Sequence, residues 1–158
     1  MADRSLTDPW QSEAIPDDDH LFLRVLSIQI DLDPEGEPLV PATVLRNHGN
    51  GMSTNWDKYS DAESVRHGSE RHPPENYAVA SFRVGGTRAI PSQGVEHTPV
   101  FVGQDDPGNN RSHTDVTGRK SRSDFKALGT SGDEAAILAT EIRNRFINLA
   151  VWVIRPGE

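Results

Sequence analysis

Residues 77–84 show the clearest alternation of hydrophobic and polar positions in the chain. An alternation of period two is typical of a half-buried β-strand, because successive side chains point to opposite faces. The apolar positions on the predicted inner face are Ala78, Ala80, Phe82 and Val84, and the polar positions on the other face are Ser81 and Arg83. We therefore predict a strand over this segment.

A second strand is predicted within residues 20–32, which read HLFLRVLSIQIDL. Leucine and β-branched residues dominate this run. Near its end, one face is expected to carry Ile28, Ile30 and Leu32. The turn-forming sequence DPEG follows at 33–36, and a short edge segment is expected over 38–41 because prolines at both ends exclude a central strand.

Glycines and polar loops separate the other strand-like segments. Gly85-Gly86 lies between 77–84 and the run 87–90, and we predict a hairpin there because tight hairpin turns require positive φ. Further strands are predicted over 94–102 and 113–117, on either side of a polar loop at 103–112.

Two helices are predicted from their capping residues. Ser60 and Glu63 fit a capping box that starts a short helix ending near Gly68. Ser131 and Glu134 fit a second capping box, which precedes apolar residues at helical spacing. This predicted buried stripe comprises Leu138, Ile142, Phe146, Leu149 and Val153, with Pro156 ending the helix.

These elements predict an α+β fold: a small, mostly antiparallel sheet with the C-terminal amphipathic helix packed on one face, and long polar loops. We expect a single domain over residues 20–158, preceded by a flexible acidic arm over 1–19. Trp10 is expected to anchor this arm to the domain, because a tryptophan in a polar segment gains most by packing on an apolar surface.

Composition adds charge to this picture. The chain has 158 residues, of which 34% are hydrophobic, and its net charge is −8, from 24 acidic and 16 basic residues. The low hydrophobic content predicts a modest core with long loops. The acidic balance argues against nucleic-acid binding, which requires a basic surface, although one local basic cluster is present at Arg111, Arg119, Lys120, Arg122 and Lys126.

The chain contains no cysteine, which excludes disulfides, thiolate metal sites and a cysteine nucleophile. Residues 1–20 lack the apolar core of a secretory signal, and no run is long and apolar enough to span a membrane. We expect a cytoplasmic protein with no membrane association.

Two histidines are the first candidates for catalytic chemistry. His97 and His113 flank the polar loop, and two imidazoles can act as general base and acid on a phosphodiester or nucleotide. Lys120 or Arg111 would neutralise the developing negative charge, and Ser53 or Thr54 would orient the substrate. The alternative is structural: His97 is then a hydrogen-bonded strand residue and His113 caps the loop.

A second polar segment, HGNGMST at 48–54, resembles a glycine-bracketed anion-binding turn followed by hydroxyls. The candidate ligand-binding residues are His48, Asn50, Ser53, Thr54, Asn110 and Arg111. A simple turn between two elements explains the segment as well.

Several common catalytic and cofactor motifs are absent from the chain. There is no HExxH sequence, calcium-binding loop or P-loop lysine, and no serine stands in GxSxG. We therefore predict no metal and no cofactor.

Two functional hypotheses follow. The first is a small accessory or binding protein that engages a protein partner or a small anionic ligand through loops 46–56 and 103–120, with an exposed patch near Trp10 or Trp56. The second is a metal-independent histidine acid/base enzyme, similar to a small nuclease or phosphoesterase.

Overall fold

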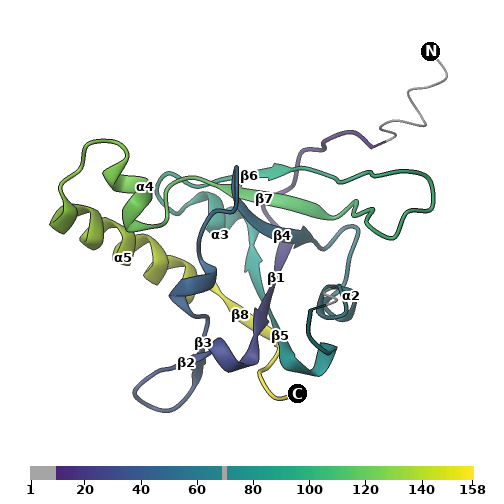
Figure 1. Ribbon diagram of the computed structural model, residues 1–158, viewed down its shortest axis with the longest axis horizontal. Helices are drawn as coiled ribbons and strands as arrows, with labels where there is room; N and C mark the ends of the chain where they lie inside the picture. Colours follow the sequence, from purple (N-terminus) through teal and green to yellow (C-terminus); the bar gives the residue numbers. More distant parts are fainter. Residues whose placement is uncertain (1–9, 69–70) are drawn as a thin grey trace.

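The computed structural model describes residues 10–68 and 71–158. At its centre is a six-stranded antiparallel sheet in the order β6-β7-β4-β1-β5-β8 (Figure 1). The strands are β1 (His20–Leu26), β4 (Met52–Trp56), β5 (Tyr77–Arg83), β6 (Gly94–His97), β7 (His113–Thr117) and β8 (Val151–Ile154). Together with the long helix α5 (Gly132–Leu149), this sheet confirms the predicted α+β class.

The main core lies between one face of the sheet and α5. The inward residues of β1 are Leu21, Leu23 and Val25, all buried. The buried residues of α5 are Ala135, Ala139, Ile142 and Phe146. Phe146 meets Phe82 of β5 edge to face, with ring centroids 5.8 Å apart. The alternate residues of the strands and the residues on one face of α5 therefore pack together in one core, as expected for an amphipathic helix on a sheet.

The predicted start of α5 is confirmed and its predicted end is wrong. Ser131 caps the helix by accepting a hydrogen bond from the Glu134 N–H. The helix ends at Leu149, because Ala150 adopts an extended conformation and 151–154 pairs with β5 as β8. Val153 is therefore a strand residue that is 46% exposed, and not the last member of a helical stripe.

The predicted hairpin at Gly85-Gly86 is also wrong. These glycines lie inside a short helix, α3 (Val84–Arg88), and neither has a positive φ. A Cβ on Gly86 would lie 2.5 Å from Leu149 Cδ1, so the missing side chain allows α3 and α5 to approach closely. Gly86 therefore allows close helix packing here, which the local sequence does not distinguish from a turn.

The alternation predicted at 28–32 does not form one strand. β1 ends at Leu26, a 3₁₀ turn (Ser27–Gln29) follows, and only β2 (Asp31–Leu32) continues, paired with β3 (Pro38–Leu39) as the predicted edge segment. Ile28 and Leu32 are 85% and 67% exposed. Their apolar side chains therefore do not contribute a buried face.

Two further short helices differ from the prediction in detail. The helix α2 (Ala62–Arg66) is capped by Asp61, whose carboxylate accepts from the Ser64 N–H, and not by Ser60. The helix α4 (Arg122–Lys126) was not predicted, although Ser121 and Asp124 form a complete capping box.

Residues 10–19 run along the domain and contact it at several points, while residues 1–9 of the predicted arm lie outside the described chain. Trp10 packs edge to face on Phe101, and Ile15 is buried in the main core. Ser12 donates a hydrogen bond to the His97 carbonyl oxygen. Within the described residues, no helix is both long enough and apolar enough to cross a membrane.

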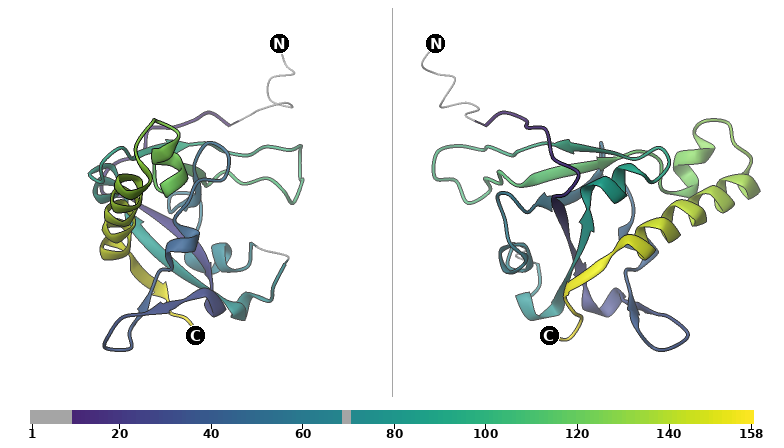
Figure 2. Two further views of the ribbon diagram at one scale, coloured as in Figure 1. Left: turned by 60° about the vertical axis from the view of Figure 1, so that its left-hand side comes forward. Right: turned by 180° about the vertical axis from the view of Figure 1, so that it is seen from behind.

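The second face of the sheet carries α2 and the β6–β7 loop. Val65 of α2 packs on Val79 of β5 and Ile154 of β8 in a separate small core. Figure 2 shows α5 on one side of the sheet, and α2 with the β6–β7 loop on the other. The candidate site lies on this second side.

Candidate functional site

A hollow opens where β1 and β4 diverge. The two strands pair through Leu21↔Trp56 and Phe22↔Asn55 alone among the described residues. Beyond these pairs, β1 continues beside β5 while β4 continues beside β7. The space between them is closed by Thr43 and Val44 and floored by Leu23 and Met52. Its cavity volume is about 310 Å³, in the range of small-molecule sites.

Two more hollows adjoin the first, and Arg24 of β1 lines all three. We call the combined depression the Arg24 trough. The first and third hollows also share Ser53 and Asn55, and the second and third share Gly68, Pro107 and Gly108. Because each pair shares lining residues, the trough is continuous over the second face of the sheet.

The two loops singled out from the sequence meet at this trough. The first loop contributes Arg46, His48, Met52, Ser53 and Asn55. The second contributes Pro107, Gly108, Asn109, Asn110, Ser112 and His113. The second loop is held in shape by Asn109, which accepts from the Val102 N–H and donates to the Gly103 carbonyl oxygen. The wall that the second loop forms is therefore held in a defined conformation.

The charged residues in the described lining of the trough are basic, whereas the protein as a whole is acidic. Its described lining includes Arg24, Arg46, Arg71, His48 and His113, but no aspartate or glutamate. The chain as a whole has 24 acidic residues and a net charge of −8. Three carboxylates close in sequence to lining residues accept hydrogen bonds from other groups: Asp61 from the Ser64 N–H, Asp106 from the Gly108 N–H and Asp115 from the Thr98 hydroxyl.

Arg24 is a half-buried cation without an ion pair to the described carboxylates. Its Nη1 donates to the Val65 carbonyl oxygen at 3.0 Å, and its guanidinium lies 5.2 Å from the centre of the Tyr77 ring. Burial lowers the pKa of Arg24 below its ordinary value, since the low-dielectric surroundings disfavour charge. An arginine nevertheless stays protonated, so its positive charge lies at the trough, where no carboxylate among residues 10–68 and 71–158 neutralises it.

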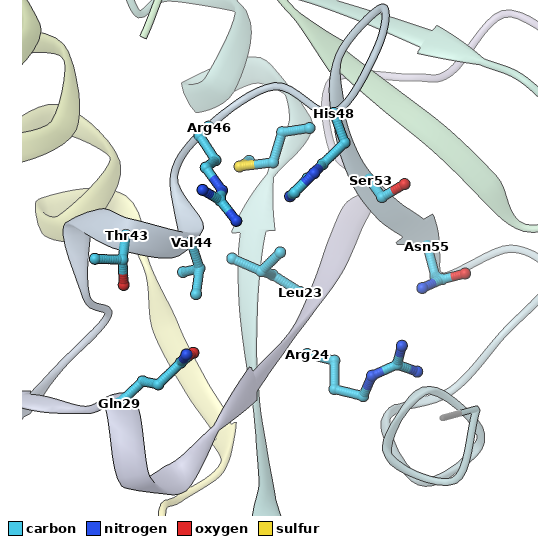
Figure 3. Close-up of a pocket in the computed structure, with 10 residues that line it drawn as sticks. Leu23, Arg24, Gln29, Thr43, Val44, Arg46, His48, Ser53 and Asn55 are labelled. Atoms are coloured by element: carbon cyan, nitrogen blue, oxygen red, sulfur yellow. The ribbon is translucent and has the colours of Figure 1, made fainter. Parts of the chain in front are cut away.

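Arg46 and His48 stand on the opposite wall of the first hollow. Figure 3 shows these two side chains pointing toward one another from the loop before β4, with Arg24 and Asn55 below them. Arg46 is exposed and makes no hydrogen bond or ion pair with the described residues. Two guanidinium groups and an imidazole therefore line one small, partly apolar hollow.

A hydrogen-bonded chain of side chains reaches the trough from β7. The Ser53 hydroxyl lies 2.8 Å from His113 Nε2, and His113 Nδ1 lies 3.0 Å from the Thr98 carbonyl oxygen and 2.9 Å from the Thr98 hydroxyl. That hydroxyl donates to Asp115 Oδ2 at 3.1 Å. Ser53 and His113 are brought together because the register places Asn55 opposite His113, which makes Ser53 a diagonal neighbour of His113.

Asn55 is oriented by two neighbours from the second loop. Its Oδ1 accepts from Asn110 Nδ2 at 2.9 Å, and the Ser112 hydroxyl also lies 2.9 Å away. Because both contacts are on the oxygen, the amide nitrogen of Asn55 points the other way, into the trough (Figure 3).

His97 lies on the other side of the sheet from His113. His97 pairs with Thr114, the residue after His113, so the two imidazoles point to opposite faces. His97 is 1% exposed, its Nδ1 accepts from the Glu13 N–H at 3.0 Å, and its Nε2 donates to the Arg111 carbonyl oxygen at 2.6 Å. Both ring nitrogens thus bind backbone, as in the structural alternative considered from the sequence.

Lys120 is fully buried and its ammonium is enclosed. Its Nζ donates to Asn47 Oδ1 at 2.6 Å, the Val116 carbonyl oxygen at 2.7 Å and the Gly118 carbonyl oxygen at 3.1 Å. Burial lowers the pKa of Lys120 to about 8, and the charges of Asp124 and Asp115 partly oppose this effect. The structure therefore does not place His97, His113 and Lys120 around one cleft.

Of the six predicted ligand-binding residues, the trough contains His48, Ser53 and Asn110. Thr54 is buried, with its hydroxyl donating to the Thr114 carbonyl oxygen, and Asn50 is an exposed turn residue outside the lining. Arg111 lies over the Tyr59 ring, 4.4 Å from its centre.

Sequence reasoning missed Arg24, Arg46 and Asn55. The available signal for Arg24 was a single arginine inside the apolar run LFLRVL, since a charge in such a run has to be solvated or bound at the sheet surface. Asn55 and Arg46 lay within the predicted loop but had no distinguishing pattern.

No family model matches this chain, and no similar protein was found among curated proteins or solved structures. Within the described residues, no group of three or more histidine or acidic side chains is placed to hold a metal ion. Functional inference therefore depends on the geometry of the Arg24 trough.

Proposed function

We propose that this protein binds a small anionic ligand in the Arg24 trough. The observation that carries the proposal is the charge contrast: Arg24, Arg46 and His48 line one hollow whose described lining has no carboxylate, in a chain of net charge −8. Guanidinium groups in a partly buried site favour carboxylates and phosphates, because both offer paired oxygen acceptors.

The dimensions favour a small molecule over a protein surface. The three hollows are concave and of mixed polarity, as is usual for ligand sites. The protein-partner hypothesis expected an exposed patch around Trp10 or Trp56. Trp56 is 1% exposed and donates to Asp19, while Trp10 packs on Phe101. A cytoplasmic location is part of the proposal on the cysteine-free composition alone.

The test is calorimetric titration with inorganic phosphate and succinate, each compared with a neutral molecule of similar size. We expect saturable binding of an anion that weakens as salt is added. Arg46→Gln should weaken it by about tenfold to a hundredfold, the range for one charge-assisted hydrogen bond. Arg145→Gln, which removes an exposed arginine from α5, is the matched control.

Two results would contradict the proposal. One is the absence of anion binding at millimolar concentration under low salt. The other is an equal loss of affinity in Arg46→Gln and Arg145→Gln, which would indicate attraction by overall charge and not by the trough.

A further inference from the structure

The side chains at the edge of the trough have the arrangement of an activated nucleophile. We propose that Ser53 is a nucleophile and His113 its general base, and that the protein hydrolyses small carboxylic esters bearing an anionic group. The anionic part of the substrate rests on the proposed binding function, whereas the nucleophile rests on the hydrogen-bonded chain alone.

The hydrogen bonds determine which nitrogen of His113 carries the proton. A carbonyl oxygen only accepts, so the contact of 3.0 Å between His113 Nδ1 and the Thr98 carbonyl oxygen requires a proton on Nδ1. In the neutral ring Nε2 then lacks a proton and accepts from the Ser53 hydroxyl across 2.8 Å. This is the tautomer that a general base needs to withdraw a proton from a serine.

Thr98 and Asp115 complete the chain as positioning residues. The Thr98 hydroxyl lies 2.9 Å from His113 Nδ1 and donates to Asp115 Oδ2 at 3.1 Å. A carboxylate is thus linked through one hydroxyl to the side of the ring that becomes positive when His113 takes the serine proton. The logic of nucleophile, base and orienting group is that of a catalytic triad, reached without a GxSxG turn.

The residues around Ser53 leave room for an ester and supply a hydrogen-bond donor for its carbonyl oxygen. Ser53 is exposed and lines both the first and the third hollow, so an acyl group has access to its hydroxyl. Asn55 stands two residues away on the same face of β4, with its amide nitrogen directed into the trough. That nitrogen is the donor available for the oxyanion of a tetrahedral intermediate.

The reaction balances with water as the second reactant. Ser53 Oγ attacks the ester carbonyl carbon while its proton passes to His113 Nε2, and the alcohol then leaves with that proton. Water attacks the acyl-serine, gives a proton to Nε2, and the collapse of the second intermediate releases the carboxylic acid and returns the proton to Ser53.

The experiment is covalent labelling of the full chain with a small, uncharged fluorophosphonate, followed by intact-mass and peptide analysis. We expect one modification per molecule, located on Ser53 and absent in Ser53→Ala. His113→Gln should slow labelling by about a hundredfold or more, as general-base catalysis contributes about 10²–10⁴. Ser123→Ala, which removes an exposed serine of α4 outside the trough, should label at the normal rate.

A second pair of variants separates positioning from folding. Thr98→Val keeps the backbone carbonyl that holds His113 and removes the link to Asp115, so labelling should slow by about tenfold, and Thr98→Ser should restore it. Turnover is then measured with p-nitrophenyl acetate and the p-nitrophenyl monoester of succinic acid. Arg46→Gln should reduce kcat/KM for the succinate ester only.

Three outcomes overturn the inference: no labelling of the unmodified protein, labelling elsewhere than Ser53, or a rate unchanged in a folded His113→Gln variant. If labelling fails while anions still bind, the nucleophile is refuted and the proposed binding function stands. If Ser53 is labelled but no anion binds, the binding function is refuted and the nucleophile stands.

Discussion

Replacement of the buried Lys120 by methionine is the perturbation with the sharpest expected signature. Methionine keeps most of the aliphatic stem and removes the three donors that bind Asn47, Val116 and Gly118. Leaving buried acceptors without these donors costs about 1–3 kcal/mol, so Lys120→Met should lower the free energy of unfolding by that amount near neutral pH.

The pH dependence of this loss has a definite sign. The pKa of Lys120 is about 8 in the folded protein, against an ordinary value of 10.5 that applies to the unfolded chain. Between these values the unfolded chain binds more protons, so stability increases with pH. From about pH 7 to about pH 9.5 this pKa difference raises the free energy of unfolding by about 2 kcal/mol. This value is an upper limit, because the three oxygen acceptors favour the ammonium and oppose the effect of burial.

The assay is urea denaturation of both proteins at these two pH values. Other groups titrate alike in both proteins, so the difference between their unfolding free energies isolates Lys120. We expect this difference to widen by up to about 2 kcal/mol at the higher pH. A difference that stays constant or narrows would show that Lys120 is not desolvated in the folded state, and would refute its assignment as an enclosed structural cation.

The remaining predictions concern stability and are measured by the same denaturation. Gly118→Ala should destabilise by about 3 kcal/mol, since φ is +109° and a Cβ would lie 2.1 Å from the Ser92 carbonyl oxygen, whereas Gly103→Ala enters open space and should change little. Ser121→Ala should lower the free energy of unfolding by about 1 kcal/mol through loss of the α4 capping box. Ser123→Ala, within the same helix, should not lower it, and equal effects of the two substitutions would contradict the capping role. Phe146→Ala should cost about 3–5 kcal/mol, because its fully buried ring packs on Phe82; a cost below 1 kcal/mol would place Phe146 outside the core.

Local patterns in the sequence predicted correctly those elements whose tertiary contacts favour the same conformation. The strand at 77–83 is confirmed, although both of its faces are buried and Ser81, predicted on the polar face, is only 7% exposed. The start of α5 at Ser131 is confirmed because capping acts over a few adjacent residues. The predictions were wrong where contacts with residues distant in sequence determined the backbone conformation. Residues 151–154 leave the helix to pair with β5, and Gly85-Gly86 forms a helix against Leu149.

The candidate site was likewise predicted only in part from the sequence. Its polar residue types were visible in the sequence, so His48, Ser53, Asn110 and His113 were identified as candidates. Their grouping was not visible, because it depends on which face of the sheet each strand presents. The register of β7 with its neighbours decides this, since a shift of one residue would exchange the two faces. In the observed register His113 contacts Ser53, whereas His97, expected as its partner, is buried on the other side.

The sequence alone thus determined the α+β class, the antiparallel strands, the amphipathic helix and the two polar loops, since each depends on spacing within a short segment. Only the tertiary structure decided that β1 and β4 diverge after two paired positions, and that Arg24 lines the hollow between them. Residues from strands some thirty positions apart in the chain meet there because strand pairing, and not local propensity, sets long-range neighbours.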